Sequence, residues 1–139
     1  MGMYPYNSQI GECGLKELYL EVLFGATGAV GTITRRAGFG AVAPAPPNSL
    51  AAITRTSAGL FTVNFDQRWQ ACIGFGVSIV GVPTAVGDGV SAFIVSRNLQ
   101  AAQPNIVIQY QAYNSATTAA DPTNTSTHLL YFGMKDSTV

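Results

Sequence analysis

Residues 53–65 read ITRTSAGLFTVNF and give the clearest structural signal in the sequence. Before the turn Ser57-Ala58-Gly59, Ile53 and Arg55 alternate with two threonines, Thr54 and Thr56. After the turn, Phe61, Val63 and Phe65 alternate with Leu60, Thr62 and Asn64. A period of two places successive side chains on opposite faces of a strand. Two such runs joined by a short turn that contains glycine predict a β-hairpin.

Further β-prone runs follow at near-regular spacing, separated by glycine, proline and small polar residues. They cover 18–24, 30–36, 75–82, 90–97, 105–113 and 126–134. The run 18–24 also fits a helical face, but the glycines that soon follow favour a strand. Together with the hairpin, these runs predict an all-β domain. Its expected architecture is a compact, jelly-roll-like β-sandwich or barrel of about eight short strands.

The rest of the chain is expected to be irregular. Residues 1–17 show no period and predict an extended N-terminal arm, which leaves 18–139 as a single domain. Residues 66–70, DQRWQ, interrupt the strand pattern and predict one helical turn with Asp66 as its N-cap. Trp69 within this turn is expected to pack in the core.

The composition is poor in charge. Of the 139 residues, 47% are hydrophobic and 10% are charged, and the net charge is zero. Soluble domains carry roughly 25% charged residues. The balance argues against nucleic acid or an anionic membrane as a partner, and no secretory signal or apolar membrane span is visible. A surface with so few charges is expected to be covered by neighbouring molecules.

Residues 24–32, FGATGAVGT, resemble the glycine string with which dinucleotide-binding enzymes hold a pyrophosphate. That site requires a strand, a tight turn and then a helix, whose N-terminus faces the phosphates. Here Gly31 is followed by TITRRAGFG and a proline-rich stretch, and no acidic residue lies between Glu21 and Asp66. The string therefore predicts a turn between two β segments and no nucleotide cofactor.

No other motif indicates catalysis. His128 is the only histidine, and its spacing places it on the same strand face as Leu130, Phe132 and Met134, as a hydrogen-bonded structural residue. The acidic residues lie mostly singly, and Cys13 and Cys72 lack metal-type spacing and are interpreted as reduced thiols. We therefore expect no catalytic, cofactor or metal site, and no enzyme.

From residue 50 onward the chain resembles small bacteriophage capsid decoration (cement) proteins. The resemblance rests on ITRTSAGLFTVNF, on DQRW with the apolar strand after it, and on NIVIQYQAYNSATTAADPTNTSTHLLYFGMKDSTV at the end. It implies a virion protein, made in the bacterial cytoplasm and bound to the outer surface of an icosahedral head. It also implies a homotrimer that bridges neighbouring major capsid proteins.

Two groups of residues are candidates for the contacts. The N-terminal arm is expected to reach other subunits or the capsid through Tyr4, Pro5, Tyr6 and Ile10. Arg35 and Arg36 beside Phe39 form either a contact patch or a solvated turn.

Two other functions fit the sequence. A receptor- or glycan-binding module of a phage fibre or tailspike would use Trp69, Tyr110 and Tyr113 to stack on sugars. A small enzyme would retain a cofactor such as NAD(P) on purification, which we do not expect.

Overall fold

The structure is a computed structural model that describes residues 15–25, 28–38, 53–80, 88–112, 118–122 and 127–135. Side chains are not described for Leu15 and for 31–38. The strands are β1 (Leu15–Phe24), β2 (Val30–Gly38), β3 (Ile53–Ser57), β4 (Leu60–Asn64), β5 (Ala71–Val80), β6 (Gly89–Asn98), β7 (Asn105–Ala112) and β8 (Thr127–Lys135).

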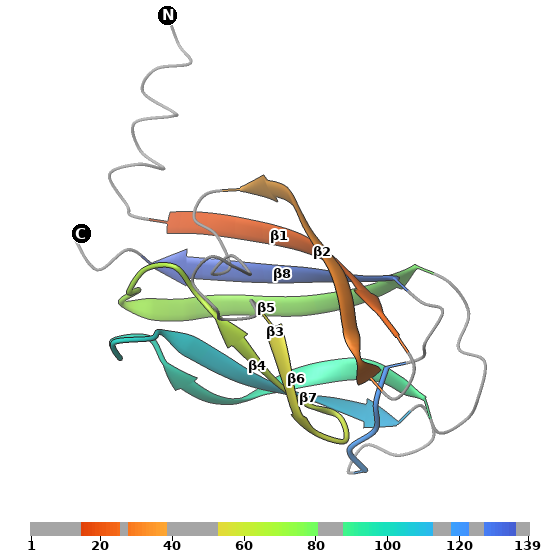
Figure 1. Ribbon diagram of the computed structural model, residues 1–139. Coiled ribbons are helices and arrows are strands. Elements are labelled where there is room, and N and C mark those ends of the chain that lie inside the picture. The colour runs from red at the N-terminus through yellow and green to blue at the C-terminus, as the bar shows by residue number, and fades with distance from the viewer. Residues whose placement is uncertain are drawn as a thin grey trace, which may run out of the picture.

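The eight strands form two antiparallel sheets packed face to face, which confirms the predicted β-sandwich (Figure 1). One sheet has the order β2-β1-β8-β5 and the other β3-β4-β7-β6. The pairs β1–β8, β4–β7 and β5–β8 join strands that are not consecutive in the chain. The other neighbours along the chain form the hairpins β1–β2, β3–β4 and β6–β7.

The hairpin predicted from 53–65 is present. Ile53 pairs with Val63, Thr54 with Thr62, and Gly59 turns the chain with a φ of +71°. The β1–β2 connection is likewise the turn that the glycine string predicts. A left-handed φ is costly for residues with a Cβ, which explains glycine at these turns.

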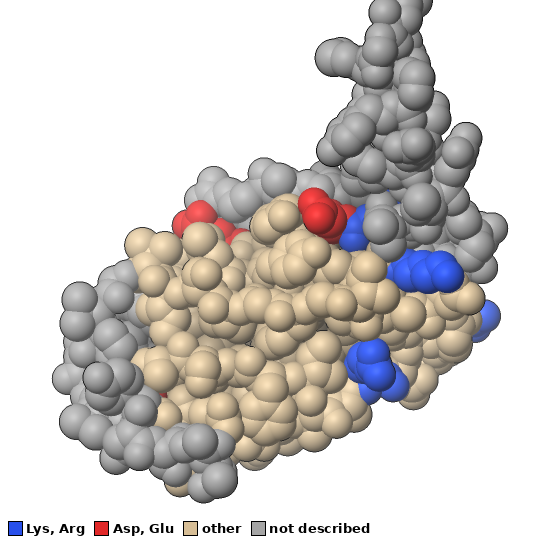
Figure 2. Space-filling model, turned by 180° about the vertical axis from the view of Figure 1, so that it is seen from behind, with Lys and Arg blue, Asp and Glu red and all other residues tan. Residues whose placement is uncertain are grey.

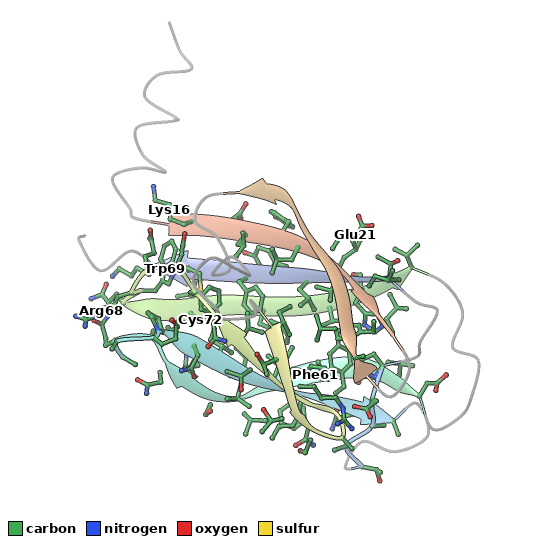
Figure 3. All side chains as sticks on the ribbon, viewed as in Figure 1. Lys16, Glu21, Phe61, Arg68, Trp69 and Cys72 are labelled. Atoms are coloured by element: carbon green, nitrogen blue, oxygen red, sulfur yellow. The ribbon has the colours of Figure 1, made fainter. Side chains whose placement is uncertain are left out.

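The core lies between the sheets and follows the predicted alternation (Figure 3). Its side chains come from the inner faces of β1, β4, β7 and β8, where every second residue is buried. Several rings meet edge to face, as Phe65 does with Phe132 at a centroid distance of 5.4 Å. The buried set includes Leu18, Leu20, Val22, Phe24, Phe61, Val63, Ile106, Ile108, Tyr110, Leu130, Phe132 and Met134.

The helical turn predicted for 66–70 is wrong. This segment forms bends, and its backbone bonds to distant strands. The Trp69 N–H donates to the Leu99 carbonyl at 3.1 Å, and the Gln70 N–H donates to the Lys135 carbonyl at 2.9 Å. Long-range bonds and burial of the Trp69 ring, which is 2% exposed, therefore replace the local bonds of a helix.

β1 begins at Leu15, inside the segment predicted as an arm. Its first residues already pair with the end of β8, Leu15 with Lys135 and Glu17 with Gly133. β5 also begins earlier than predicted, at Ala71, because Cys72 pairs with Met134. Strand ends are thus set by the partner strand rather than by the local pattern.

Asp121 joins the β3–β4 hairpin to the start of β6 at the end of the sandwich opposite the start of β1. Its carboxylate accepts bonds from Arg55 Nε and Nη2 at 2.9 and 2.8 Å and from the Gly59 N–H at 2.9 Å. The Gly89 N–H donates to its carbonyl at 2.8 Å. Although partial burial opposes ionisation, these hydrogen bonds hold the pKa of Asp121 below its usual range. We call this group the Asp121 junction.

The glycine string has a role in this junction. A Cβ at Gly28, whose φ is +72°, would lie 2.5 Å from Asp121 Oδ1 and 3.1 Å from Arg55 Nε. Residue 28 is therefore a glycine because the Arg55–Asp121 ion pair occupies the space that a side chain would need.

Gly28→Ala is expected to destabilise the fold by about 2 kcal/mol, because it combines left-handed backbone with a collision at the Asp121 junction. Gly76→Ala is the matched control, since a Cβ there meets nothing within 4 Å. Urea unfolding of the two variants checks this. An equal effect of both substitutions would contradict the role given to Gly28.

Candidate interaction surface

The predicted contact residues are mostly outside the described part of the chain. Tyr4, Pro5, Tyr6, Ile10 and Phe39 all lie there, so their contacts stay predictions. Arg35 and Arg36 lie within β2, where Arg35 pairs with Leu20 of β1, and not in a turn. The two arginines therefore lie in a strand, as the run 30–36 predicts, and whether their side chains form a contact patch or are solvated stays open as a prediction. The side chains of both arginines are outside the description.

The glycine string lacks the setting of a dinucleotide site. It connects β1 to β2, the two strands are antiparallel, and no α-helix occurs in the described part of the chain. A pyrophosphate site depends on the N–H groups of a following helix. These segments thus supply no such cradle.

His128 is a buried structural residue, as predicted. Its Nδ1 lies 3.0 Å from the Tyr110 hydroxyl, and both side chains are fully buried. Edge-to-face contacts join the two rings to Phe24 at centroid distances of 5.1 and 5.7 Å. Burial lowers the pKa of His128 to about 4, because the charged imidazolium loses its hydration. The ring is therefore neutral at physiological pH and is inaccessible to a substrate.

Two of the three aromatic residues proposed to stack on sugars are buried. Trp69 is 2% exposed and Tyr110 is 0% exposed, so neither ring offers a face to a ligand. Tyr113 lies outside the described residues. The glycan-binding hypothesis loses its main support.

On the face that Figure 2 shows, the charged side chains lie at the margin of a wide uncharged area. Four of the five described Lys and Arg side chains lie at the end where β1 begins and β8 ends, namely Lys16, Arg68, Arg97 and Lys135. The fifth, Arg55, is paired with Asp121. Figure 2 shows a wide uncharged area beside this basic end.

The outer strands β5 and β6 carry most of the exposed large apolar side chains. Ile73 is 60% exposed, Val80 57%, Val95 50% and Phe93 40%. The remaining exposed members, Tyr19, Leu23 and Leu129, are on β1 and β8. β5 and β6 are outer strands of different sheets and approach each other along one side of the sandwich. We call Ile73–Val80 and Val90–Ser96 the β5–β6 flank.

The core is also incompletely covered at this flank. Phe75 and Val77 pair with Phe132 and Leu130, which are fully buried, yet both are themselves only partly buried. On β6, Ile94 faces inward in the same way opposite Ile108. Phe75 still contacts the Phe132 ring at a centroid distance of 5.2 Å. The flank therefore leaves part of the hydrophobic core open to solvent.

An apolar groove of about 600 Å³ adjoins the flank on the outer face of the first sheet. Its walls include Tyr19, Tyr131 and Leu129, and Gly76 and Ser78 of β5 form one side. The two tyrosine rings pack at 5.1 Å with an angle of 39°. The ring of Tyr131 fills the space above Gly74, where a Cβ would lie 3.2 Å from its Cε1. Larger apolar patches of this kind mark interaction surfaces.

Sequence reasoning missed this surface although a signal was present. The runs 75–82 and 90–97 are apolar on both faces, which is typical of strands covered on both sides. In the described structure each sheet is covered on one face only, so the second apolar face is exposed. The sequence pattern alone does not reveal which strands lie at the edge.

Other kinds of site receive no support from the described segments. They contain no group of three or more His, Cys, Asp or Glu side chains placed to hold a metal ion. Cys72 is a buried free thiol whose pKa is raised by burial. Within the same segments, no helix has the length and apolar character needed to cross a membrane.

Comparison of the chain with protein-family models, curated proteins and solved structures gives no match.

The fold is expected to lose about 2 kcal/mol of stability between pH 7 and pH 5 through His128. Its pKa is lower in the folded state than in the unfolded chain, so unfolding takes up a proton in this range. The stability that depends on a neutral His128 is fully present above about pH 6.5. It is lost as the pH falls towards about 4, the pKa of His128 in the folded state. Urea unfolding at pH 7 and 5 measures the loss.

The control is His128→Gln, which removes the titrating group. This variant is less stable at pH 7, but its stability changes less between pH 7 and 5 than that of the parent. An identical pH dependence of the two proteins would exclude His128 as the cause.

Proposed function

We propose that this protein is a structural virion protein that decorates the outer surface of an icosahedral phage head and links neighbouring major capsid proteins. The observation that carries the proposal is the β5–β6 flank, where exposed apolar side chains lie above an incompletely covered core. Burying such a surface requires a protein partner. The resemblance to decoration proteins indicates which partner this is.

The charge distribution supports a protein partner over other classes. The flank between Ile73 and Val80 and between Val90 and Ser96 contains no charged residue. A nucleic acid or an anionic membrane would need many basic side chains on one face. Hydrophobic burial gives stable contacts without them. The surface is suited to a permanent structural contact.

Multivalent attachment would provide the strength of a cement. A homotrimer presents three copies of every contact, so modest contacts combine into tight binding. The N-terminal arm, through Tyr4, Pro5, Tyr6 and Ile10, is proposed to extend these contacts to adjacent subunits. Binding would then resist the outward pressure of the packaged genome.

Deletion of residues 1–14 is expected to abolish capsid occupancy and leave the domain folded. The strand β1 begins at Leu15, so the deletion removes no described strand residue. Co-sedimentation with DNA-filled heads of the encoding phage measures occupancy, and circular dichroism checks the fold. Full occupancy without the arm would refute its role.

Phe93→Lys is expected to lower the affinity for these heads about tenfold or more, because it removes apolar contact and buries a charge. Thr54→Lys is the matched control, since Thr54 is exposed on β3 at the opposite edge of the same sheet. Binding isotherms on DNA-filled heads compare the two variants. Equal losses would indicate a general effect of charge and not a contact at the flank.

A further inference from the structure

β5 is a long edge strand with little of the usual protection among the described residues. It runs from Ala71 to Val80 and contains no charged residue and no proline. Among the described strands it pairs only with β8, so its second edge carries backbone N–H and C=O groups that no described strand pairs. Natural proteins protect such edges with lysine, proline, bulges or a covering segment. Beyond the Cys72 end of β5 the described residues provide none of these features, and such an edge is suited to pairing with another strand.

Part of the edge is closed from within the molecule. Arg97 Nη1 donates to the Cys72 carbonyl at 3.1 Å, and the pairing of β5 with β8 shifts register between Cys72 and Gly74. The regular stretch begins after this bulge and spans Gly74–Val80. Its central residue is Val77.

A partner strand would satisfy two requirements at once. It would pair the backbone edge, and its inward side chains would cover Phe75 and Val77, which are only partly buried. A helix or an irregular loop would cover the side chains but leave the ladder unpaired. The edge therefore selects an extended apolar strand.

We infer that this strand is β5 of a second copy, paired antiparallel about a twofold axis at Val77. The two sheets then join into one continuous eight-stranded sheet. In this register Phe75 lies opposite Ile79 and Gly76 lies opposite Ser78 of the other copy. Residues that lie opposite each other in an antiparallel pair must point to the same face of the sheet. Phe75 and Ile79 meet this condition, because they pair with Phe132 and His128 of β8, which both point inward.

Charge and size favour the second copy as the occupant. A twofold contact brings two copies of the same strand together, so a strand with a net charge would repel its copy. Gly74–Val80 is neutral throughout. The outward positions Gly74, Gly76 and Ser78 are small, and a Cβ at Gly76 meets open space. The approach of two copies therefore meets neither repulsion nor large outward side chains along most of the stretch.

This contact covers the β5 part of the flank and leaves the exposed side chains of β6, Phe93 and Val95, for the capsid contact. It extends the proposed function but does not depend on it. A closed trimer uses a different, head-to-tail surface, since a twofold contact joins copies only in pairs. Pairing through β5 would connect copies that belong to neighbouring trimers. The test in solution contains no capsid, so its result is separate from capsid binding.

The first test compares Ser78→Lys with Ser91→Lys by sedimentation equilibrium of the full chain. Both serines are exposed, and Ser91 lies on β6 opposite Gln111. A lysine on an edge strand opposes pairing. We expect Ser78→Lys to halve the mass of the parent assembly, or to weaken its association about tenfold or more, and Ser91→Lys to leave it unchanged. A parent that is monomeric at about 1 mM, or an assembly that both variants leave intact, overturns the inference.

The second test does not depend on a charged residue. Residues directly opposite in an antiparallel pair have Cβ atoms about 5 Å apart, within reach of a disulfide after small adjustment. Val77→Cys, in a Cys13→Ser background, is therefore expected to form a covalent dimer on mild oxidation. Leu129→Cys is the control, because Leu129 is 40% exposed but lies on β8, away from the edge. Absence of the Val77→Cys dimer, or equal dimer formation by both variants, overturns the pairing.

Discussion

The pairing of β1 with β8 is the interaction on which the rest of the structure depends. It joins 15–23 with 127–135 at the centre of the first sheet. The inward side chains of these two strands form the surface against which the second sheet packs. Without β8, β1 has no link to β5, and the ring cluster around His128 and Phe24 cannot form. The cost is entropic, because the two strands are separated by most of the chain. Burial of the shared core offsets that cost.

The sequence predicts this fold well where a strand is buried on one face and polar on the other. The hairpin at 53–65 and the inward faces of β7 and β8 follow directly from their alternation. Prediction fails where tertiary contacts outweigh local preference, as at 66–70, where Trp69 is buried and its backbone bonds to Leu99. The Asp121 junction was also beyond prediction, because Arg55 and Asp121 are 66 residues apart in the chain and meet only in the folded structure.

The candidate surface was likewise predicted only in part from the sequence. The low charge of the chain indicates a surface that neighbours cover, but it does not say where that surface lies. Strand order provides the location, since it places β5 and β6, which carry most of the exposed large apolar side chains, at the edges of different sheets on the same side. In the glycine string, by contrast, a local pattern suggests a site that the fold does not provide. This pattern resembles a phosphate site, yet in the fold the space at Gly28 accommodates an ion pair.

The β1–β8 pairing also has a consequence for biosynthesis. During translation β1 leaves the ribosome long before β8 exists, so the first sheet cannot close until residues 127–135 have emerged. The hairpin β3–β4 can form early from local contacts, whereas β5 waits with both of its edges unpaired. A nascent chain in this state exposes a neutral, apolar strand to every neighbouring chain on the same polysome. Rapid completion of the chain therefore protects the protein from association before its sheet is assembled.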